Sequence, residues 1–167
     1  MNALETVRKW LEAFPQSGVL SGFQVDYTDK IPGTGGIMPD GLVEVRRSRD
    51  IVGDTTITNQ YNFGLYCVLE KAPNDDVGAA KNADWIVDLQ EWVQEQSATG
   101  AAPVFGDDPR AERITAQNGT LLQADGEGTG VYVVQLSVQF IKKFKGENKW
   151  LIWRLTRRLD RLWIGSS

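Results

Sequence analysis

The side chains that most often carry out chemistry in proteins are scarce in this sequence. It contains no His, and Cys67 is its single Cys. A Ser-His or Cys-His nucleophilic pair is therefore excluded, and the residue types that most often bind zinc are missing, although schemes based on Lys or carboxylates remain open. Cys67 falls at the same alternate positions of an expected strand as Tyr61, Phe63 and Leu65, and therefore on the same face. We expect Cys67 to be a buried strand residue rather than a reactive thiol.

Two acidic pairs and one glycine-rich segment are the other candidates for a reactive or binding site. Asp75/Asp76 and Asp107/Asp108 are neighbours in sequence, whereas catalytic carboxylates converge from separate elements, so capping and solubility are the favoured roles. Gly33–Gly36 (GTGG) lacks the Lys and the Ser/Thr of a phosphate-binding P-loop, and we expect a flexible loop there. The sequence thus predicts no catalytic residue, no metal ligand and no cofactor.

Charge is distributed unevenly along the chain. The net charge is −4, but residues 142–167 contain eight basic and two acidic residues, a charge of +6 that leaves −10 for residues 1–141. An acidic body repels polyphosphate, while the basic end could attract nucleic acid, anionic lipid or an acidic neighbour.

A cluster of arginines, Arg46, Arg47 and Arg49, stands at the end of an expected strand, before a turn. Strand alternation places Arg47 and Arg49 on one face. Two interpretations stay open: a solvated edge guarded against aggregation, or an interface with a partner.

The segment Lys149–Ser167 has helical periodicity, with apolar residues on one side and arginines on the other. Such a basic amphipathic helix could lie on a membrane, grip nucleic acid or dock on a protein, and docking on its own body or an adjacent subunit is the favoured interpretation. With the arginine cluster, it supplies the candidate interface residues: Arg46, Arg47, Arg49, Trp150, Trp153, Arg154, Arg157, Arg158, Arg161 and Trp163.

Hydrophobic periodicity predicts an α+β fold in which a mostly antiparallel sheet is packed on one face by an N-terminal and a central helix. The N-terminal helix starts at Ala3 and is stopped by Pro15, and the central helix lies within Val77–Gln96. Expected strands are Phe23–Tyr27, one from Val43 through the arginines, Ile57–Leu69, Arg113–Ala124 and Gly130–Phe144, with Ile31–Gly41 as a loop. We expect one domain over residues 1–148, a C-terminal extension over 149–167, and neither a signal peptide nor a membrane span.

The ordered pattern of these segments resembles a known family. WIVDLQEWVQEQSATGAAPVF, followed by ITAQNGTLLQADGEGTGVYVVQLSVQFIKKF, resembles the minor capsid or tail-terminator-like proteins encoded among the head–tail joining genes of long-tailed phages and prophages of Gram-positive bacteria. LETVRKWLEAFP and FQVDYTD are similar too. The resemblance spans about residues 1–145, whereas Lys149–Ser167 matches nothing in the family.

The resemblance implies a sheet backed by helices and a non-enzymatic protein that assembles as a ring, commonly a hexamer. Its partners would be copies of itself, the tail tube protein and the head–tail connector, and its location the neck of the virion, after assembly in the host cytoplasm. Nucleic acid and membrane would not be its partners. The alternative function is an adaptor that binds nucleic acid or anionic membrane through its basic C-terminal helix.

Overall fold

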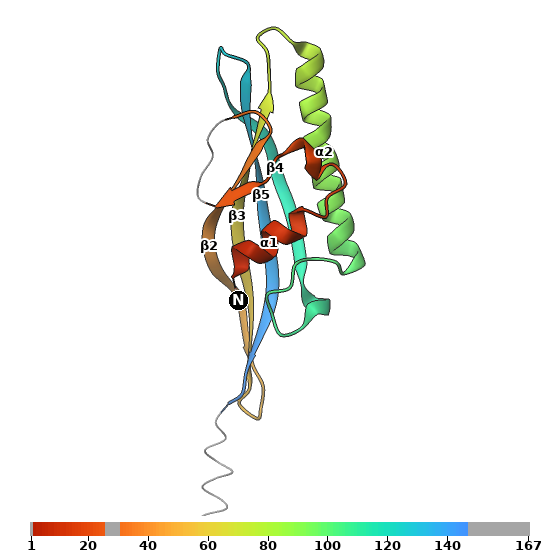
Figure 1. Ribbon diagram of the computed structural model, residues 1–167. Helices are drawn as coiled ribbons and strands as arrows, with labels where there is room; N and C mark the ends of the chain where they lie inside the picture. Colours follow the sequence, from red (N-terminus) through yellow and green to blue (C-terminus); the bar gives the residue numbers. More distant parts are fainter. Residues whose placement is uncertain (1, 26–30, 147–167) are drawn as a thin grey trace, which may run out of the picture.

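The computed structural model describes residues 2–25 and 31–146 (Figure 1). Over these residues the fold is α+β, with two α-helices and a five-stranded mixed sheet in the strand order β1-β2-β3-β5-β4. The elements are α1 (Ala3–Leu11), β1 (Phe23–Val25), β2 (Thr34–Arg49), β3 (Thr55–Glu70), α2 (Asp76–Thr99), β4 (Arg113–Ala124) and β5 (Thr129–Phe144), with short 3-10 turns at Ser17–Val19 and Pro109–Ala111.

Both helices cover the same face of the sheet, as expected from their apolar stripes (Figure 1). The stripe of α2 is buried as predicted, and α1 buries Val7 and Leu11 against the same core. Tryptophans join the two helical segments: the rings of Trp10 and Trp92 lie 4.5 Å apart, and the Trp85 Nε1 donates a hydrogen bond to the Gln16 carbonyl. The core therefore lies between the helices and the alternate residues of β3 and β5 that face them.

The ends of α2 follow its sequence signals. Asp75 is the N-cap, and its carboxylate accepts a hydrogen bond from the Gly78 N–H. Gly100 ends the helix in the left-handed region, where glycine is unstrained. By contrast, α1 ends at Leu11 rather than running on to Pro15 as predicted. The turn that follows still buries Phe14, whose ring lies 5.4 Å from that of Trp92, so the apolar spacing continues past the helix end.

The sheet is mostly antiparallel, as predicted, with one exception. β2 pairs antiparallel with β3, β3 with β5, and β5 with β4, whereas the three residues of β1 pair parallel to β2. Apolar alternation at Phe23 identified β1 as a strand, but alternation carries no information about strand direction.

The prediction that Ile31–Gly41 is a loop is wrong, because β2 begins at Thr34. Gly35, Gly36 and Ile37 are buried and pair with both β1 and β3. A Cβ on Gly35 would stand 2.6 Å from Cδ1 of Phe23, so glycine here permits close packing rather than flexibility.

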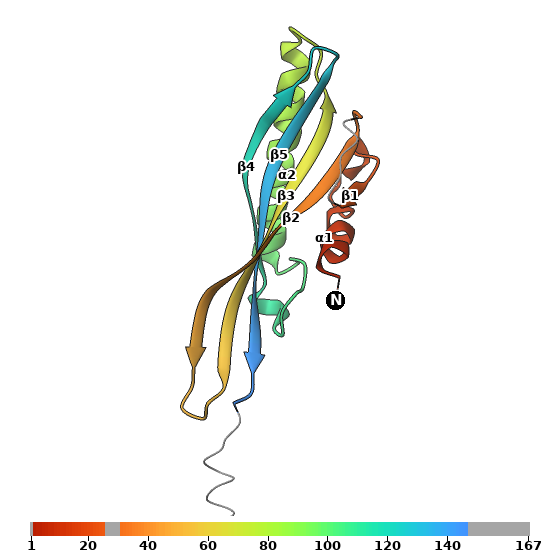
Figure 2. The same ribbon diagram turned by 90° about the vertical axis from the view of Figure 1, so that its left-hand side faces the viewer.

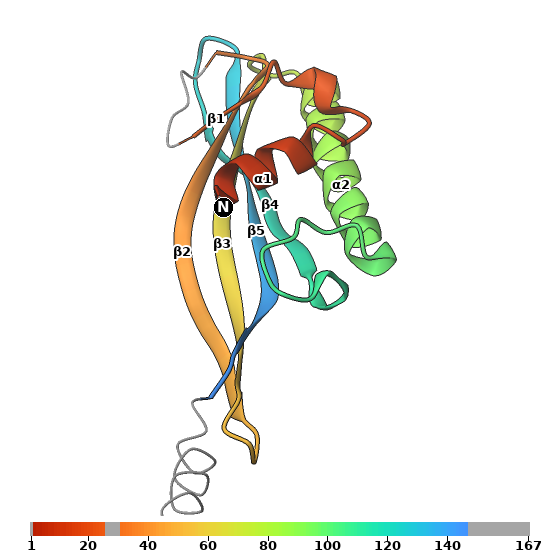
Figure 3. The same ribbon diagram turned by 60° about the horizontal axis from the view of Figure 1, so that its bottom comes forward.

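Three strands continue beyond the helices (Figure 2). We call this extension the arm and define it as residues 42–59 of β2, β3 and their turn, with residues 141–146 at the end of β5. Figure 3 shows β2 curving along the sheet toward the arm, while α1 and α2 stay over the other half. Among the residues that the structure describes, the sheet thus has one half that the helices cover and one half that they leave uncovered, both built from the same strands.

Candidate interaction surface

The arm exposes apolar side chains that a folded chain usually buries. Every residue of β2 from position 40 onward is exposed, although the same strand is buried at positions 35–37. Leu42 is 60% exposed and Phe144 is 54% exposed. Val43, Val45, Ile51 and Val52 are exposed with them. Exposed apolar groups gathered at one end of a protein are typical of a surface that meets a partner.

The arm is held in shape by its turn. Asp50 accepts hydrogen bonds from the N–H groups of Val52 and Asp54 through one carboxylate oxygen, and Gly53 takes a positive φ of 96°. Asp54 in turn accepts a bond of 2.9 Å from the N–H of Gly146, which fastens the end of β5 to the turn between β2 and β3. The arm is therefore a three-stranded unit rather than a loose hairpin.

The register places the arginine cluster on both faces of the arm. Arg47 lies opposite Ile57, which lies opposite Lys142, and all three are on the face that carries the helices further up the sheet. Arg49 lies on the same face, as the alternation predicted, while Arg46, the neighbour of Arg47, lies on the other face by the same alternation.

One exposed ion pair orders the arginine side chains. Nε and Nη2 of Arg47 donate to the two carboxylate oxygens of Glu44 at 2.9 and 2.7 Å. This hydrogen-bonded pairing lowers the pKa of Glu44 and raises that of Arg47. Because both groups are solvated, the pair orients the guanidinium more than it stabilises the fold.

β2 also has an open edge. Its partner β1 covers only Gly35, Gly36 and Ile37, so from Met38 to Arg49 the second edge of β2 has no strand partner within the described residues. Pro39 and two bulges interrupt this edge, which are features that hinder indiscriminate strand addition.

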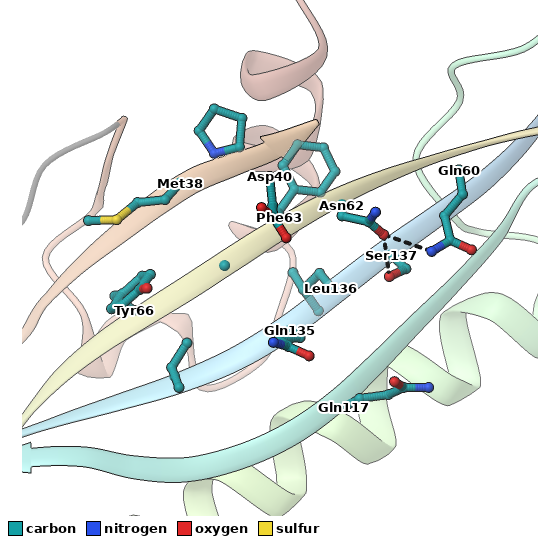
Figure 4. A pocket seen from close by; sticks show the side chains of 13 residues that line it. Met38, Asp40, Gln60, Asn62, Phe63, Tyr66, Gln117, Gln135, Leu136 and Ser137 are labelled. Carbon is teal, nitrogen blue, oxygen red and sulfur yellow. Dashed lines mark hydrogen bonds between the residues drawn. The ribbon is translucent and has the colours of Figure 1, made fainter. Parts of the chain in front are cut away.

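The sheet face opposite the helices has a shallow hollow of about 490 Å³ (Figure 4). Uncharged polar side chains dominate its lining, among them Gln60, Asn62, Gln117, Gln135 and Ser137, and Asp40 also lines it.

These polar groups hydrogen-bond to one another. Gln60 and Ser137 both donate to the side-chain Oδ1 of Asn62 at 2.8 Å, and Gln139 donates to the side-chain Oε1 of Gln60 at 2.9 Å. Amides and a hydroxyl paired in this way supply neither a nucleophile with its base nor a pair of carboxylates. The arrangement suits a neutral, wettable surface better than a reactive centre.

One carboxylate that was not predicted to be buried, Glu112, is only 1% exposed. Its Oε1 accepts hydrogen bonds from the N–H groups of Phe105 and Gly106, and its Oε2 has no partner within the described residues. Burial raises the pKa of this carboxyl, against the opposing effect of the two N–H groups. Glu112 therefore joins the two ends of residues 105–112 through hydrogen bonds within the loop, and nothing in the local sequence distinguishes it from a solvated acid.

The other candidate positions are buried, cap a helical turn or take part in an ion pair. Cys67 is fully buried as predicted, and burial raises the pKa of its thiol to about 12. Asp75 and Asp108 cap helical turns, and Asp107 accepts a bond from the Lys143 N–H while lying 3.5 Å from Nζ of Lys142. Capping by Asp75 and Asp108 is confirmed, whereas the pairing of Asp107 with Lys142 was not predicted from the sequence.

The C-terminal candidates, Trp150 to Trp163 with their arginines, lie outside the described residues. Over the residues that the structure does describe, no cluster of three or more metal-ligating side chains occurs. In that same part of the chain, neither helix combines the length and apolarity that a bilayer crossing requires.

Comparison with known proteins adds no family assignment: no protein-family model matches the chain, and no curated protein matches it either.

Proposed function

We propose that this chain is a structural protein of a tailed phage virion, a subunit of the tail terminator ring that caps the tail tube and joins it to the head connector. The observation that carries the proposal is the arm, in which ordered strands keep Leu42, Val43 and Phe144 exposed beside a cluster of arginines. A surface of this kind gains free energy when a protein partner covers it.

The order of elements supports the proposal through the resemblance. An N-terminal helix, a central helix that ends at a small-residue exit after Thr99, and a hairpin of β4 and β5 are the features on which the resemblance rests. The hydrogen-bonded amides of the open sheet face suit a subunit that makes contacts without breaking bonds.

The proposal is tested by measuring particle mass over a range of concentrations and by negative-stain imaging of the full chain mixed with purified tail tubes. We expect ring-shaped particles of uniform mass, seated on tube ends. A chain that stays monomeric at the highest concentration and never engages a tube end would refute the proposal.

A second function, an adaptor for nucleic acid or anionic membrane, is favoured by one further observation. Lys142, Lys143 and Lys145 lie in the same arm as the arginine cluster, just before the basic segment 149–167. In this case the chain should bind duplex DNA or anionic vesicles, with affinity falling steeply as salt rises. Removing residues 149–167 should abolish that binding, and unchanged binding after the removal would eliminate this function.

A further inference from the structure

The outer face of α2 has a charge pattern opposite to that of the arm. Between Asp76 and Thr99 the helix carries five carboxylates and one lysine. Asp84, Glu91 and Glu95 are exposed on the side away from the buried stripe, together with Val87, which is 49% exposed. Like charges at this spacing repel one another along a helix, so an oppositely charged partner would relieve a repulsion present in the isolated chain.

Resting on the proposed ring function, we infer that the helix-side face of the arm in one copy docks on the outer face of α2 in the next copy. The occupant of the uncovered arm is thus a second copy of this chain. Within one chain the arm projects beyond the end of α2, so the two surfaces do not meet (Figure 2).

The spacing of the groups supports this pairing. On the arm, Arg47, Ile57 and Lys142 form a row of cation, apolar residue and cation across three neighbouring strands, which spans about 9.5 Å at two strand spacings. On the helix, Asp84, Val87 and Glu91 form a row of anion, apolar residue and anion at i, i+3 and i+7. That row spans about 10.5 Å at the rise of an α-helix.

The two rows match in order and in length, and their charges are opposite in sign. A helix lying across the arm strands would bring both cations to both anions, with Ile57 against Val87 between them. Arg49 and the exposed ring of Phe144, one step further along the same face, would extend the contact.

This contact joins two different surfaces, so it is heterologous and propagates from copy to copy until rotation closes a ring. In the single chain, Arg47 pairs with Glu44 and Lys142 pairs with Asp107, and both pairs are exposed. In this arrangement the two pairs keep the cations extended until the next copy docks.

The test uses two charge-reversed variants of the full chain, an arm variant (R47E/K142E) that reverses both cations of the row and a helix variant (D84K/E91K) that reverses both anions. Asp88 is left intact because it accepts a hydrogen bond from Gln16. Each variant alone presents like charges at every contact, and we expect its self-association to weaken at least tenfold. An equimolar mixture restores opposite charges at every contact of an alternating ring, so particles of the wild-type mass should return. Matched controls with the same charge changes elsewhere, K9E/K71E and E70K/E127K, should assemble like the wild type.

The outcomes separate this inference from the function on which it rests. If the wild type assembles and the variants assemble equally well, or if their mixture fails to recover assembly, the arm-to-helix contact is wrong and the ring proposal stands. If the wild type itself never assembles, with or without tail tubes, the proposed function fails as well.

A cysteine pair provides a second measurement that does not depend on charge. The full chain carrying I57C and V87C should form a ladder of disulfide-linked copies under mild oxidation, and each single variant should give at most dimers. Buried Cys67 should stay silent, because its thiol is fully covered. Absence of linked species beyond the dimer in assembled wild-type-like particles would overturn the inference.

Discussion

The covered half and the arm are built from the same strands but differ in what surrounds them. Ile37 and Leu65 face each other in the register and are completely buried under the helices, whereas Leu42 and its partner Tyr61 stand where that cover ends. The difference shows that one continuous sheet can place its stability at one end and its contacts at the other. Changes in the covered half should therefore act on folding, and changes in the arm on association.

The largest expected effect comes from two matched leucine truncations. Leu65→Ala removes a fully buried side chain and should lower the free energy of unfolding by about 2–5 kcal/mol. Leu42→Ala, at a position 60% exposed, should change it by less than about 0.5 kcal/mol. Urea unfolding of dilute, monomeric protein, followed by tryptophan fluorescence, measures both. Equal losses in the two variants would erase the distinction between the halves.

A smaller effect is expected at Gly35, in the covered half of β2. Gly35→Ala brings a methyl group against the Phe23 ring and should cost about 1–3 kcal/mol, as overpacking does. Gly18→Ala is the control, since nothing lies within 4 Å of a Cβ at that position. The same urea titration measures the free energy of unfolding of both variants. A Gly35→Ala variant as stable as the control would show that β1 does not pack closely against β2.

The pH dependence of the free energy of unfolding tests the role of Glu112, at the base of the arm. Its pKa is raised in the folded protein, so the folded state binds more protons than the unfolded state between the ordinary and the raised value. The free energy of unfolding should then fall as pH rises through that window and level off above it. Glu112→Gln keeps an oxygen for the Phe105 and Gly106 N–H groups and should flatten this slope.

The matching control for this pH dependence is Glu127→Gln, in the exposed turn between β4 and β5. It should retain the wild-type slope when unfolding is measured at a series of pH values. Identical slopes for the wild type and Glu112→Gln would show that the buried carboxyl titrates as it does in water.

The smallest effect is expected at the arm's own ion pair. Arg47→Gln removes both hydrogen bonds to Glu44, yet the pair is solvated, so the urea midpoint of dilute protein should stay within experimental error. Self-association of the same variant should weaken measurably in sedimentation. A large loss of stability without any loss of association would reverse the roles assigned to the two halves.

Most of the elements follow from hydrophobic periodicity, because alternation in β3 and β5 and the stripe of α2 reflect real burial. The start of β2 was missed because its glycines suggest a loop by composition, although Gly35 is required by the packing of Phe23. The extent of the arm could not be predicted either. The alternation of apolar and polar residues that begins at Ile57 continues without a break into the buried part of β3. This pattern does not reveal where the covering helices stop.

The candidate surface was predictable only in part. The arginine cluster stands out in the sequence, and alternation correctly placed Arg47 with Arg49. Its alignment with Ile57 and Lys142 depends on pairing between strands some 85 residues apart in the chain, from Ile57 to Lys142, which no local pattern encodes. Glu112 was missed for the same reason, since its burial depends on the path of a loop.

Hydrogen–deuterium exchange of the wild-type chain, dilute and at concentrations where it assembles, tests the central claim most directly. We expect the backbone amides of residues 40–49 and the outer turns of α2 to gain protection on assembly, while the already buried amides of the covered half stay unchanged. An assembled particle in which the arm exchanges as fast as in the monomer would contradict the claim that copies meet through it.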